Sequence, residues 1–451
     1  MVGKVHGGGG LRPVKPGRAS KVASHVRKEN RWTNRQPAPA SAALKVHPNV
    51  AEAVVEALLD IFKQGQYADR VIERTLKAHS KWGSRDRRFV AETTYELVRW
   101  WRSYWWLAGL PPADYLRVEE ISMRRVWRMF AVYMWRQEGA FPDLRECEGI
   151  DTRDLGMRLS AQPPLQVRAA ISDWLHETCT AELGETWPPL LEALNKPADV
   201  FLRVNTLKTT LSDLEAKLVA DRIDADPVPG LPDTLRLRER RNVFSAAAFH
   251  EGLFEVQDAG SQQIAPLLEV APGMRVIDAC AGAGGKTLHL GALMKNKGRI
   301  IALDIHQWKL DELRRRAARN GVDNVETRLI DDPKVIKRLS GDADRVLLDV
   351  PCSGLGVIRR NPDTKWKLKP EELDRLRATQ SDLLERYAPM TKPGGKLVYA
   401  TCSILPSENE KQVQAFLAKA GPAWQLETEV TLRPDREGFD GFYAARLVRV
   451  S

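Results

Sequence analysis

The sequence predicts an α/β domain with a doubly wound parallel sheet, preceded by an all-helical region and a small α+β insert. After residue 273, short apolar segments alternate with segments of helical periodicity, which is typical of a parallel sheet covered by helices. A glycine-rich turn, several acids and two cysteines each directly follow one of these apolar segments. Because ligands bind at the carboxyl ends of parallel strands, these residues are expected to surround one site.

Five apolar segments are predicted to be the strands of this sheet. Helices are expected from about Lys286, after the first strand, and over 308–320, after the second. The predicted strands cover residues 275–279, 299–303, 325–330, 344–348 and 396–400.

The chain before residue 257 reads as three further parts. The first 46 residues are expected to be a disordered basic tail. Between 47 and 150, apolar residues recur at intervals of three and four, as in Ala53, Ala57 and Ile61, which predicts an all-helical region. Residues 151–256 are expected to form a helical linker with a break at 195–197, then a small α+β subdomain with a strand at 200–205 and a helix at 211–220. The α/β domain takes residues 257–451.

The tail carries most of the chain's charge. Its ten Lys and Arg and one acid give 10 − 1 = +9 of the net charge of +10. Rich in Gly, Pro, Ala and Ser, it cannot bury enough apolar surface to fold. It either binds phosphates without sequence preference or only keeps the protein soluble, and the composition does not decide between them.

Thirteen tryptophans are many, and several lie among arginines in the helical region. Aromatic side chains interleaved with arginine can stack on unpaired bases. A helical core with a basic rim gives the same pattern, and we favour the core for most of these tryptophans.

Composition narrows the class of protein. No apolar run reaches the ~18–20 residues of a membrane-spanning helix, so no membrane association is expected. The five cysteines are too few and too irregularly spaced for a disulfide framework, so free thiols and a cytoplasmic location are expected. None lies in C-x-x-C spacing, so no metal site is expected. A monomer is expected.

The glycine-rich turn at 280–286 matches neither common phosphate-binding motif. A P-loop needs Gly where Cys280 stands, and a dinucleotide fingerprint needs Gly at Thr287. The turn still lets the backbone approach a ligand at the start of a helix. The residues expected to bind this ligand are Cys280, Ala281, Gly282, Ala283, Gly284, Gly285 and Lys286.

Acids at three successive strand ends indicate which ligand the turn binds. Asp304 suits a ribose diol, and Asp331 or Asp332 could accept a hydrogen bond from an adenine amino group. Asp349 is expected at the same site. The set fits S-adenosylmethionine better than NAD.

Cys352 and Cys402 each follow a predicted strand beside this turn. Either alone would more often be a buried apolar thiol. Together they suit methylation at C5 of a pyrimidine, where a thiolate adds to C6 and a second group helps to release it. Asp349 would bond the edge of the base, and Lys286 would offset charge near the thiolate.

Three blocks of the sequence resemble a known protein family. The blocks 278–287, 346–366 and 397–410 are similar to the RsmB/Sun family of RNA (cytosine-C5)-methyltransferases, and the resemblance extends over about 160–451. Residues 48–145 look more loosely like the NusB-like RNA-binding domain of some members. The resemblance implies a Rossmann-like catalytic domain of the class I methyltransferase type.

The resemblance also implies roles. Cys402 would be the nucleophile and Cys352 would assist release; the spacing alone leaves this assignment open. The substrate would be ribosomal RNA. The alternatives are transfer RNA, or a catalytically silent RNA-binding assembly factor. The family turn usually has Ala at Gly282 and Pro at Ala283, so a less preorganised turn is expected here.

Basic residues near these motifs are candidates for RNA contacts. Arg203 and Lys208 could bind phosphates, and the basic residues after Cys352 could line the RNA entry. The run at 236–241 reads more often as a solvated face. The group after Cys352 comprises Arg359, Arg360, Lys365 and Lys367.

Overall fold

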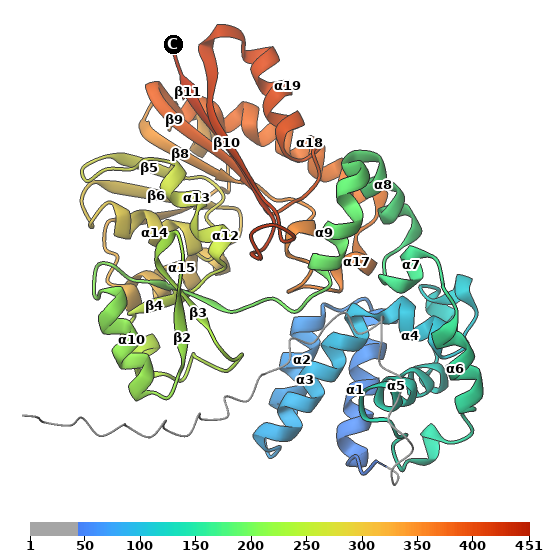
Figure 1. The fold of residues 1–451 in the computed structure, drawn as a ribbon. Helices are drawn as coiled ribbons and strands as arrows, with labels where there is room; N and C mark the ends of the chain where they lie inside the picture. Colours follow the sequence, from blue (N-terminus) through green and yellow to red (C-terminus); the bar gives the residue numbers. More distant parts are fainter. Residues whose placement is uncertain (1–43) are drawn as a thin grey trace, which may run out of the picture. The chain divides into compact units, whose positions relative to one another are not determined.

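The computed structural model describes residues 44–451 (Figure 1). The helical region is the first part of this range. Its tryptophans are mostly core residues, as predicted: Trp101 and Trp105 are fully buried, and Trp127 and Trp135 nearly so. The helices are α1 (Pro48–Phe62), α2 (Ala68–Ala78), α3 (Ser84–Arg99), α4 (Trp101–Leu107) and α5 (Met123–Glu138).

The predicted basic tail lies outside the described residues, except for its last three. Leu44 forms a β-bridge with Pro142 and exchanges backbone hydrogen bonds with Phe141 and Asp143. Leu44 is thus joined to the end of the helical region.

Short helices connect the helical region to the first strand. The expected break at 195–197 is confirmed, because α9 ends at Leu194. These helices are α6 (Thr152–Ser160), α7 (Leu165–Arg168), α8 (Asp173–Leu183) and α9 (Trp187–Leu194).

The α+β insert is an antiparallel sheet with strand order β2-β3-β1-β4 and its own apolar core. The predicted strand at 200–205 and helix at 211–220 are confirmed. Its elements are β1 (Phe201–Val204), α10 (Leu211–Ala220), β2 (Ala225–Val228), β3 (Leu231–Leu237), α11 (Ala247–His250) and β4 (Phe254–Val256).

The α/β domain contains a seven-stranded sheet with the order β10-β11-β9-β8-β5-β6-β7. All five predicted strands are present and run parallel to one another. The strands are β5 (Arg275–Asp278), β6 (Arg299–Asp304), β7 (Val325–Leu329), β8 (Ala343–Asp349), β9 (Thr391–Thr401), β10 (Trp424–Leu432) and β11 (Phe442–Arg449).

The sheet is parallel over the five predicted strands and antiparallel at one edge. β11 pairs antiparallel with both β9 and β10, because β10 and β11 follow each other as a hairpin. From β5 the chain continues through β6 and β7 on one side and through β8 and β9 on the other. The crevice at this reversal lies at the carboxyl ends of β5 and β8, which is where such sheets bind ligands.

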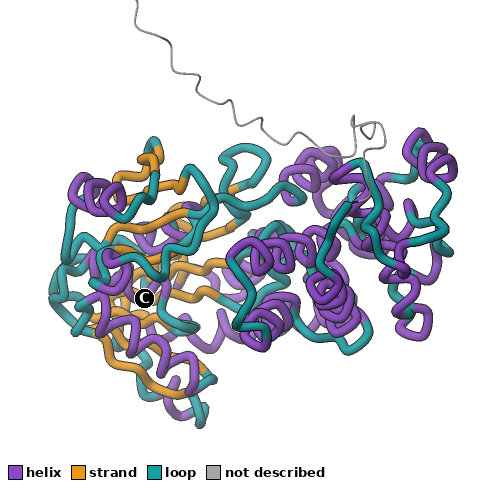
Figure 2. The backbone as a smooth tube through the Cα atoms, turned by 90° about the horizontal axis from the view of Figure 1, so that it is seen from below, coloured by secondary structure: helices purple, strands orange, loops and turns teal. Residues whose placement is uncertain are grey.

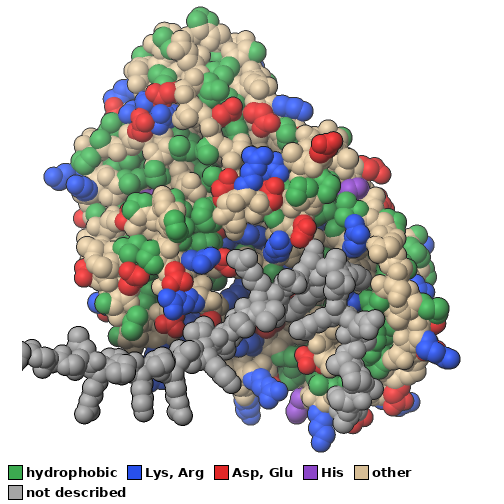
Figure 3. All heavy atoms as spheres, viewed as in Figure 1, with side chains coloured by type: hydrophobic (Ala, Val, Ile, Leu, Met, Phe, Trp, Pro, Cys, Tyr) green, Lys and Arg blue, Asp and Glu red, His purple; other side chains and the backbone are tan. Residues whose placement is uncertain are grey.

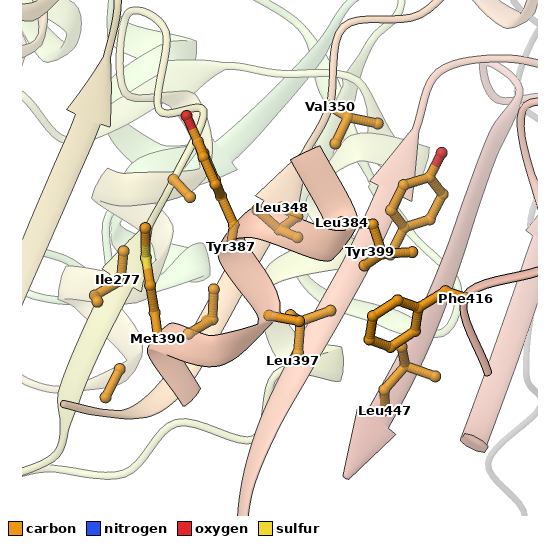
Figure 4. Close-up of a cluster of buried hydrophobic side chains, with 14 of the residues drawn as sticks. Ile277, Leu348, Val350, Leu384, Tyr387, Met390, Leu397, Tyr399, Phe416 and Leu447 are labelled. Atoms are coloured by element: carbon orange, nitrogen blue, oxygen red, sulfur yellow. The ribbon is translucent and has the colours of Figure 1, made fainter. Parts of the chain in front are cut away.

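Helices cover both faces of the sheet. Figure 4 shows one face, where Leu348 and Leu397 pack against Leu384, Tyr387 and Phe416 of two helices. Neighbouring strand residues point to the opposite face and pack against α13 and α14. The helices of this domain are α12 (Ala259–Gln262), α13 (Ile264–Leu267), α14 (Gly285–Leu293), α15 (Gln307–Asn320), α16 (Lys334–Lys337), α17 (Thr364–Lys367), α18 (Pro370–Tyr387) and α19 (Glu410–Ala420).

The segment around α17 connects the α/β domain to the helical region. Asp363 accepts a hydrogen bond from the backbone N–H of Ala68 at 3.0 Å, and the indole of Trp366 donates to the carbonyl of Val98 at 2.7 Å. In Figure 2 the helical region is built from helices and loops, while the strands lie in the insert and the α/β domain.

Candidate active site

The glycine-rich turn joins β5 to α14 and is held in place from several sides. Gly284 has φ +88°, and a Cβ there would come within 2.6 Å of Leu313, so a side chain would be both strained and blocked. The backbone N–H of Gly282 donates to Oδ2 of Asp304 at 3.0 Å. Arg316 donates to the carbonyl of Ala283 at 2.7 Å. These contacts fix the backbone of the turn at Gly282, Ala283 and Gly284.

A cavity of about 320 Å³ opens beside this turn. It lies at the carboxyl ends of β5 and β8, as the sequence predicts. Its lining includes most of the turn, both ends of the Lys286–Asp349 pair and part of the insert's last strand: Val256, Gln257, Ser261, Asp278, Cys280, Ala281, Gly282, Ala283, Gly285, Lys286, Arg316 and Asp349.

Asp278, which the sequence analysis missed, ends β5 and lines this cavity. Its Oδ2 accepts a hydrogen bond from the Thr287 hydroxyl at 2.7 Å, whereas its buried Oδ1 has no partner among the described residues. Burial raises the pKa of Asp278 to about 7. An unpaired carboxylate oxygen at a pocket suits a cationic group, such as the ammonium of S-adenosylmethionine. Its place directly before the glycine-rich turn was the available sequence signal.

The acids expected to bind ribose and adenine differ in their surroundings. Asp304 is buried at the end of β6 and accepts from the backbone N–H groups of Gly282 and His306. Each of its oxygens keeps a second lone pair for a ribose hydroxyl. Asp332 accepts from the backbone N–H of Lys334 at 2.8 Å. Both acids are exposed, and Asp331, which has no hydrogen bond to another described residue, is the better candidate for the adenine contact.

Lys286 and Asp349 form an ion pair at the cavity wall, with Nζ and Oδ2 2.6 Å apart. Burial lowers the pKa of the Lys286 ammonium, but Asp349, Cys402 and Asp278 outweigh burial, so the pKa lies above its ordinary value. Lys286 is thus a permanent cation whose surroundings include the sulfur of Cys402.

The structure brings the two cysteines together. Cys352 and Cys402 follow β8 and β9, and their sulfur atoms lie 3.3 Å apart. Their mutual hydrogen bond raises the pKa of the Cys352 thiol well above its ordinary value, and burial and the charge of Glu408 add to this effect. Cys352 therefore stays protonated and can donate its S–H to Cys402. Burial likewise raises the pKa of Cys280.

A second residue that the sequence analysis missed, Glu408, lies beneath both cysteines. It is fully buried and accepts hydrogen bonds from the hydroxyls of Ser353 and Ser403, which follow Cys352 and Cys402. No spacing signal marks this acid, because Ser403 is five residues away whereas Ser353 lies 55 residues away in the chain.

The prediction that Arg203 and Arg359 bind RNA is wrong, since both are buried. Arg203 donates to Gln257 and, at 2.7 Å, to the carbonyl of Gly285. Arg359 forms an ion pair with the fully buried Asp440. Both arginines hold segments of the fold together.

Two further predicted contacts involve groups that already have partners. The ammonium of Lys208, although exposed, donates to the carbonyls of Glu251 and Arg319 at 2.8 and 2.6 Å. Arg360 is about one-third exposed and pairs with Asp258 and Asp440.

The two lysines expected at the RNA entry serve the junction with the helical region. Lys365 is buried and donates to the carbonyl of Arg99 at 2.8 Å, so its predicted place at the entry is wrong. Lys367 pairs with Asp363 at 2.9 Å.

The run at 236–241 is mainly a solvated face, as favoured. Arg238 pairs with Asp226 at 2.7 Å, and both are exposed. Arg240 is exposed, with no hydrogen bond or ion pair to another described residue. On the face shown in Figure 3, acidic side chains lie beside many of the basic ones.

Two classes of feature are absent from residues 44–451. No three or more His, Cys, Asp or Glu side chains there gather in a group that could hold a metal ion. Within the same range, every helix is too short or too polar to cross a membrane.

Comparison with known proteins gives consistent matches. Residues 265–448 match the family model described as 16S rRNA methyltransferase RsmB/F, and residues 171–244 match its RsmF/B-like ferredoxin-like domain. The probable ribosomal RNA small subunit methyltransferase B of Synechocystis sp. is 30% identical over 433 residues, which cover 86% of this chain and 97% of the relative. The ribosomal RNA small subunit methyltransferase B of Yersinia pseudotuberculosis is 35% identical over 284 residues, 61% of this chain and 66% of the relative.

Solved structures extend the comparison to the fold. The crystal structure of PH0851 has a TM-score of 0.75 at 26% identity and covers 90% of this chain and 100% of its own. A methyltransferase homolog from Pyrococcus horikoshii has a TM-score of 0.56 at 29% identity and covers 63% and 97%. NSun6 from the same organism, solved with the S-adenosylmethionine analogue SFG, shares the fold at 22% identity and a TM-score of 0.58, over 63% and 99%.

The comparisons and the geometry agree on the class of chemistry. The fold is of the class I methyltransferase type, and the protein binds S-adenosylmethionine. The chain belongs to the RsmB/F family of rRNA methyltransferases, as an enzyme that methylates RNA with S-adenosylmethionine.

Proposed function

We propose that this enzyme methylates C5 of a cytosine in RNA through a covalent bond between Cys402 and C6 of the base. The observation that carries the proposal is the pair of sulfur atoms 3.3 Å apart, at the ends of β8 and β9 and beside the cofactor cavity. A methyltransferase acting on a ring nitrogen or a ribose hydroxyl has no need of two thiols at this place.

The residues divide the reaction between them. The Cys402 thiolate adds to C6, and the C5–C6 double bond becomes part of an enamine whose C5 is nucleophilic. Lys286 and the S–H of Cys352 stabilise that thiolate before attack, and Asp349 bonds the edge of the base. S-adenosylmethionine, held by the turn with Asp278 and Asp304, supplies an electrophilic methyl group.

Release regenerates the enzyme. Once C5 carries the methyl group, its proton passes to a water molecule, the C5–C6 double bond re-forms and the S–C6 bond breaks, which restores the Cys402 thiolate. Cys352 assists this elimination from 3.3 Å away. Its raised pKa keeps Cys352 protonated, so its S–H can stabilise the departing Cys402 thiolate as it does before attack.

The substrate that we propose is ribosomal RNA of the small subunit. The names of the curated relatives support it. Arg240, exposed and unpaired among the described residues, is a candidate for a phosphate contact. Transfer RNA remains the alternative substrate; a silent assembly factor is disfavoured because both thiols are present. We propose a monomer in the cytoplasm, and the five free cysteines suit a reducing compartment.

Methylation of purified small-subunit RNA tests the proposal. After incubation with the enzyme and S-adenosylmethionine, bisulfite sequencing should show one newly protected cytosine, and nucleoside mass spectrometry should show 5-methylcytidine. The Cys402→Ala variant is the matched control. Methyl groups found only on ribose or on another base would contradict the proposal, and a product only in transfer RNA would support the alternative substrate.

A further inference from the structure

Glu408 lies between the two loops that carry the thiols. Its Oε1 accepts hydrogen bonds from the backbone N–H of Ser353 at 2.8 Å and from the amide of Gln380 at 2.9 Å. Its Oε2 accepts from the hydroxyls of Ser353 and Ser403. A carboxylate has about four acceptor sites, and all four are used.

The composition of this network is unusual for a buried charge. Glu408 is 0% exposed, yet none of the described Lys or Arg residues forms an ion pair with it. A buried carboxylate that is compensated by neutral donors alone is costly. Its four donors come from the loop after β8, the loop after β9 and helix α18.

The main chain at Glu408 is held independently of its side chain. The hydroxyl of Tyr399 in β9 donates to the carbonyl of Glu408 at 2.7 Å. The next residue, Asn409, accepts a hydrogen bond from Thr401 and donates to the carbonyl of Ser403. The backbone at Glu408 is therefore held in place, so that the carboxylate can hold both loops.

We infer that Glu408 is a positioning residue that holds the Cys352 and Cys402 loops at the spacing needed for their shared work. The effect of this positioning on catalysis rests on the proposed function, but the distance between the two sulfur atoms can be tested without RNA. Each serine that Glu408 binds directly follows one of the cysteines, so loss of the carboxylate should let the sulfur atoms separate.

Disulfide trapping measures this spacing. Diamide takes up the two thiol hydrogens and is reduced to the hydrazine, while the sulfurs form one bond and the protein loses 2 Da. In the wild-type protein the Cys352–Cys402 disulfide should form rapidly. In Glu408→Ala it should form at least tenfold more slowly, while the affinity for S-adenosylmethionine stays within twofold.

Conservative and control variants separate positioning from general damage. Glu408→Gln keeps one acceptor oxygen and can donate to the serine hydroxyls, so its trapping rate should return to within threefold of wild type. Glu326→Ala removes a carboxylate of β7, three strands away from β8 in the same sheet, that pairs with Arg299 and Arg328, and should trap at the wild-type rate. With RNA, kcat of Glu408→Ala should fall at least tenfold with little change in KM for the cofactor.

The outcomes are decisive in either direction. A folded Glu408→Ala protein that traps at the wild-type rate would overturn the inference, as would a Gln variant as slow as the Ala variant. If Glu408→Ala does not fold, the Ser353→Ala/Ser403→Ala double variant takes its place, with the same slow trapping expected. Slow trapping in an enzyme that never methylates cytosine would refute the proposed function and leave the inference standing.

Discussion

The cofactor cavity and the thiol pair lie at the same edge of one sheet but are built differently. In the cavity, at the ends of β5 and β8, Oδ1 of Asp278 is buried without a partner among the described residues. Around the thiols, at the ends of β8 and β9, Glu408 uses all its acceptor sites and the two sulfurs contact each other.

This difference suits the cavity to binding the cofactor and the thiol pair to the chemical reaction. A pocket with unpaired groups is completed by its ligand, which gains the interactions that the protein leaves open. Groups that must react together are better held by the protein itself, because their geometry then costs nothing at the moment of reaction. Changes in the cavity should therefore alter affinity, and changes around the thiols should alter rate.

The largest effect is expected at the nucleophile. Cys402→Ala should lower methyl transfer by about 10⁴-fold or more, the scale of losing a covalent nucleophile. Cofactor affinity should stay nearly unchanged, because the thiol contacts the base. Radioactive methyl transfer measures the first quantity and calorimetry the second. Full activity of the purified variant would refute the mechanism.

The next effect concerns Asp304, which accepts a hydrogen bond from the glycine-rich turn. Asp304→Ala should weaken S-adenosylmethionine binding by ~1–3 kcal/mol, since it leaves the backbone N–H groups of Gly282 and His306 without their acceptor and removes the expected ribose contact. Calorimetry at constant pH measures this change. Unchanged affinity would show that Asp304 neither shapes the turn nor meets the ribose.

A smaller effect, dependent on pH, is expected at Asp278. With a pKa of about 7, its carboxylate is charged above neutral pH and protonated below it. Asp278→Asn should therefore bind S-adenosylmethionine about tenfold more weakly than wild type at pH 8 and nearly equally at pH 6. A tenfold difference in affinity equals the free energy of about one pKa unit, ~1.4 kcal/mol. Equal affinities at both values would place the cofactor's cation elsewhere.

The same residue gives a prediction for the ligand-free protein. Because the folded pKa of Asp278 is raised, the native state holds its proton between about pH 4 and 7 while the unfolded state has lost it, so stability falls as pH rises through this window. Asp278→Asn should remove this decline, and thermal melts from pH 5 to 8 would show it. A variant whose melting temperature falls in parallel with wild type would contradict the assignment.

The smallest effect touches neither region. Residues 1–43 hold nine Lys and Arg and one acid, a charge of 9 − 1 = +8. Their deletion should weaken RNA binding and flatten its salt dependence, without changing which cytosine is modified, because phosphate contacts position but do not specify. An unchanged salt slope would mean that the tail only keeps the protein soluble.

The sequence predicted most of what depends on local pattern. The five parallel strands follow from their apolar runs, and placing Cys352 and Cys402 at neighbouring strand ends followed from the rule for parallel sheets. The antiparallel β10–β11 edge was missed because β10 is largely exposed and alternates weakly. Arg359 looked free because its partner Asp440 lies 81 residues away, and the link from Glu408 to the Cys352 loop gave no signal because Ser353 lies 55 residues away.

A covalent protein–RNA adduct that survives denaturation tests the central claim most directly. If Cys402 attacks C6 and Cys352 assists release, Cys352→Ala should form the bond, accept the methyl group and fail to let go. Incubated with substrate RNA and cofactor, this variant should give a protein–RNA band on a denaturing gel, which Cys402→Ala and the double variant should lack. A band with Cys402→Ala alone would contradict the account and reverse the roles of the two thiols.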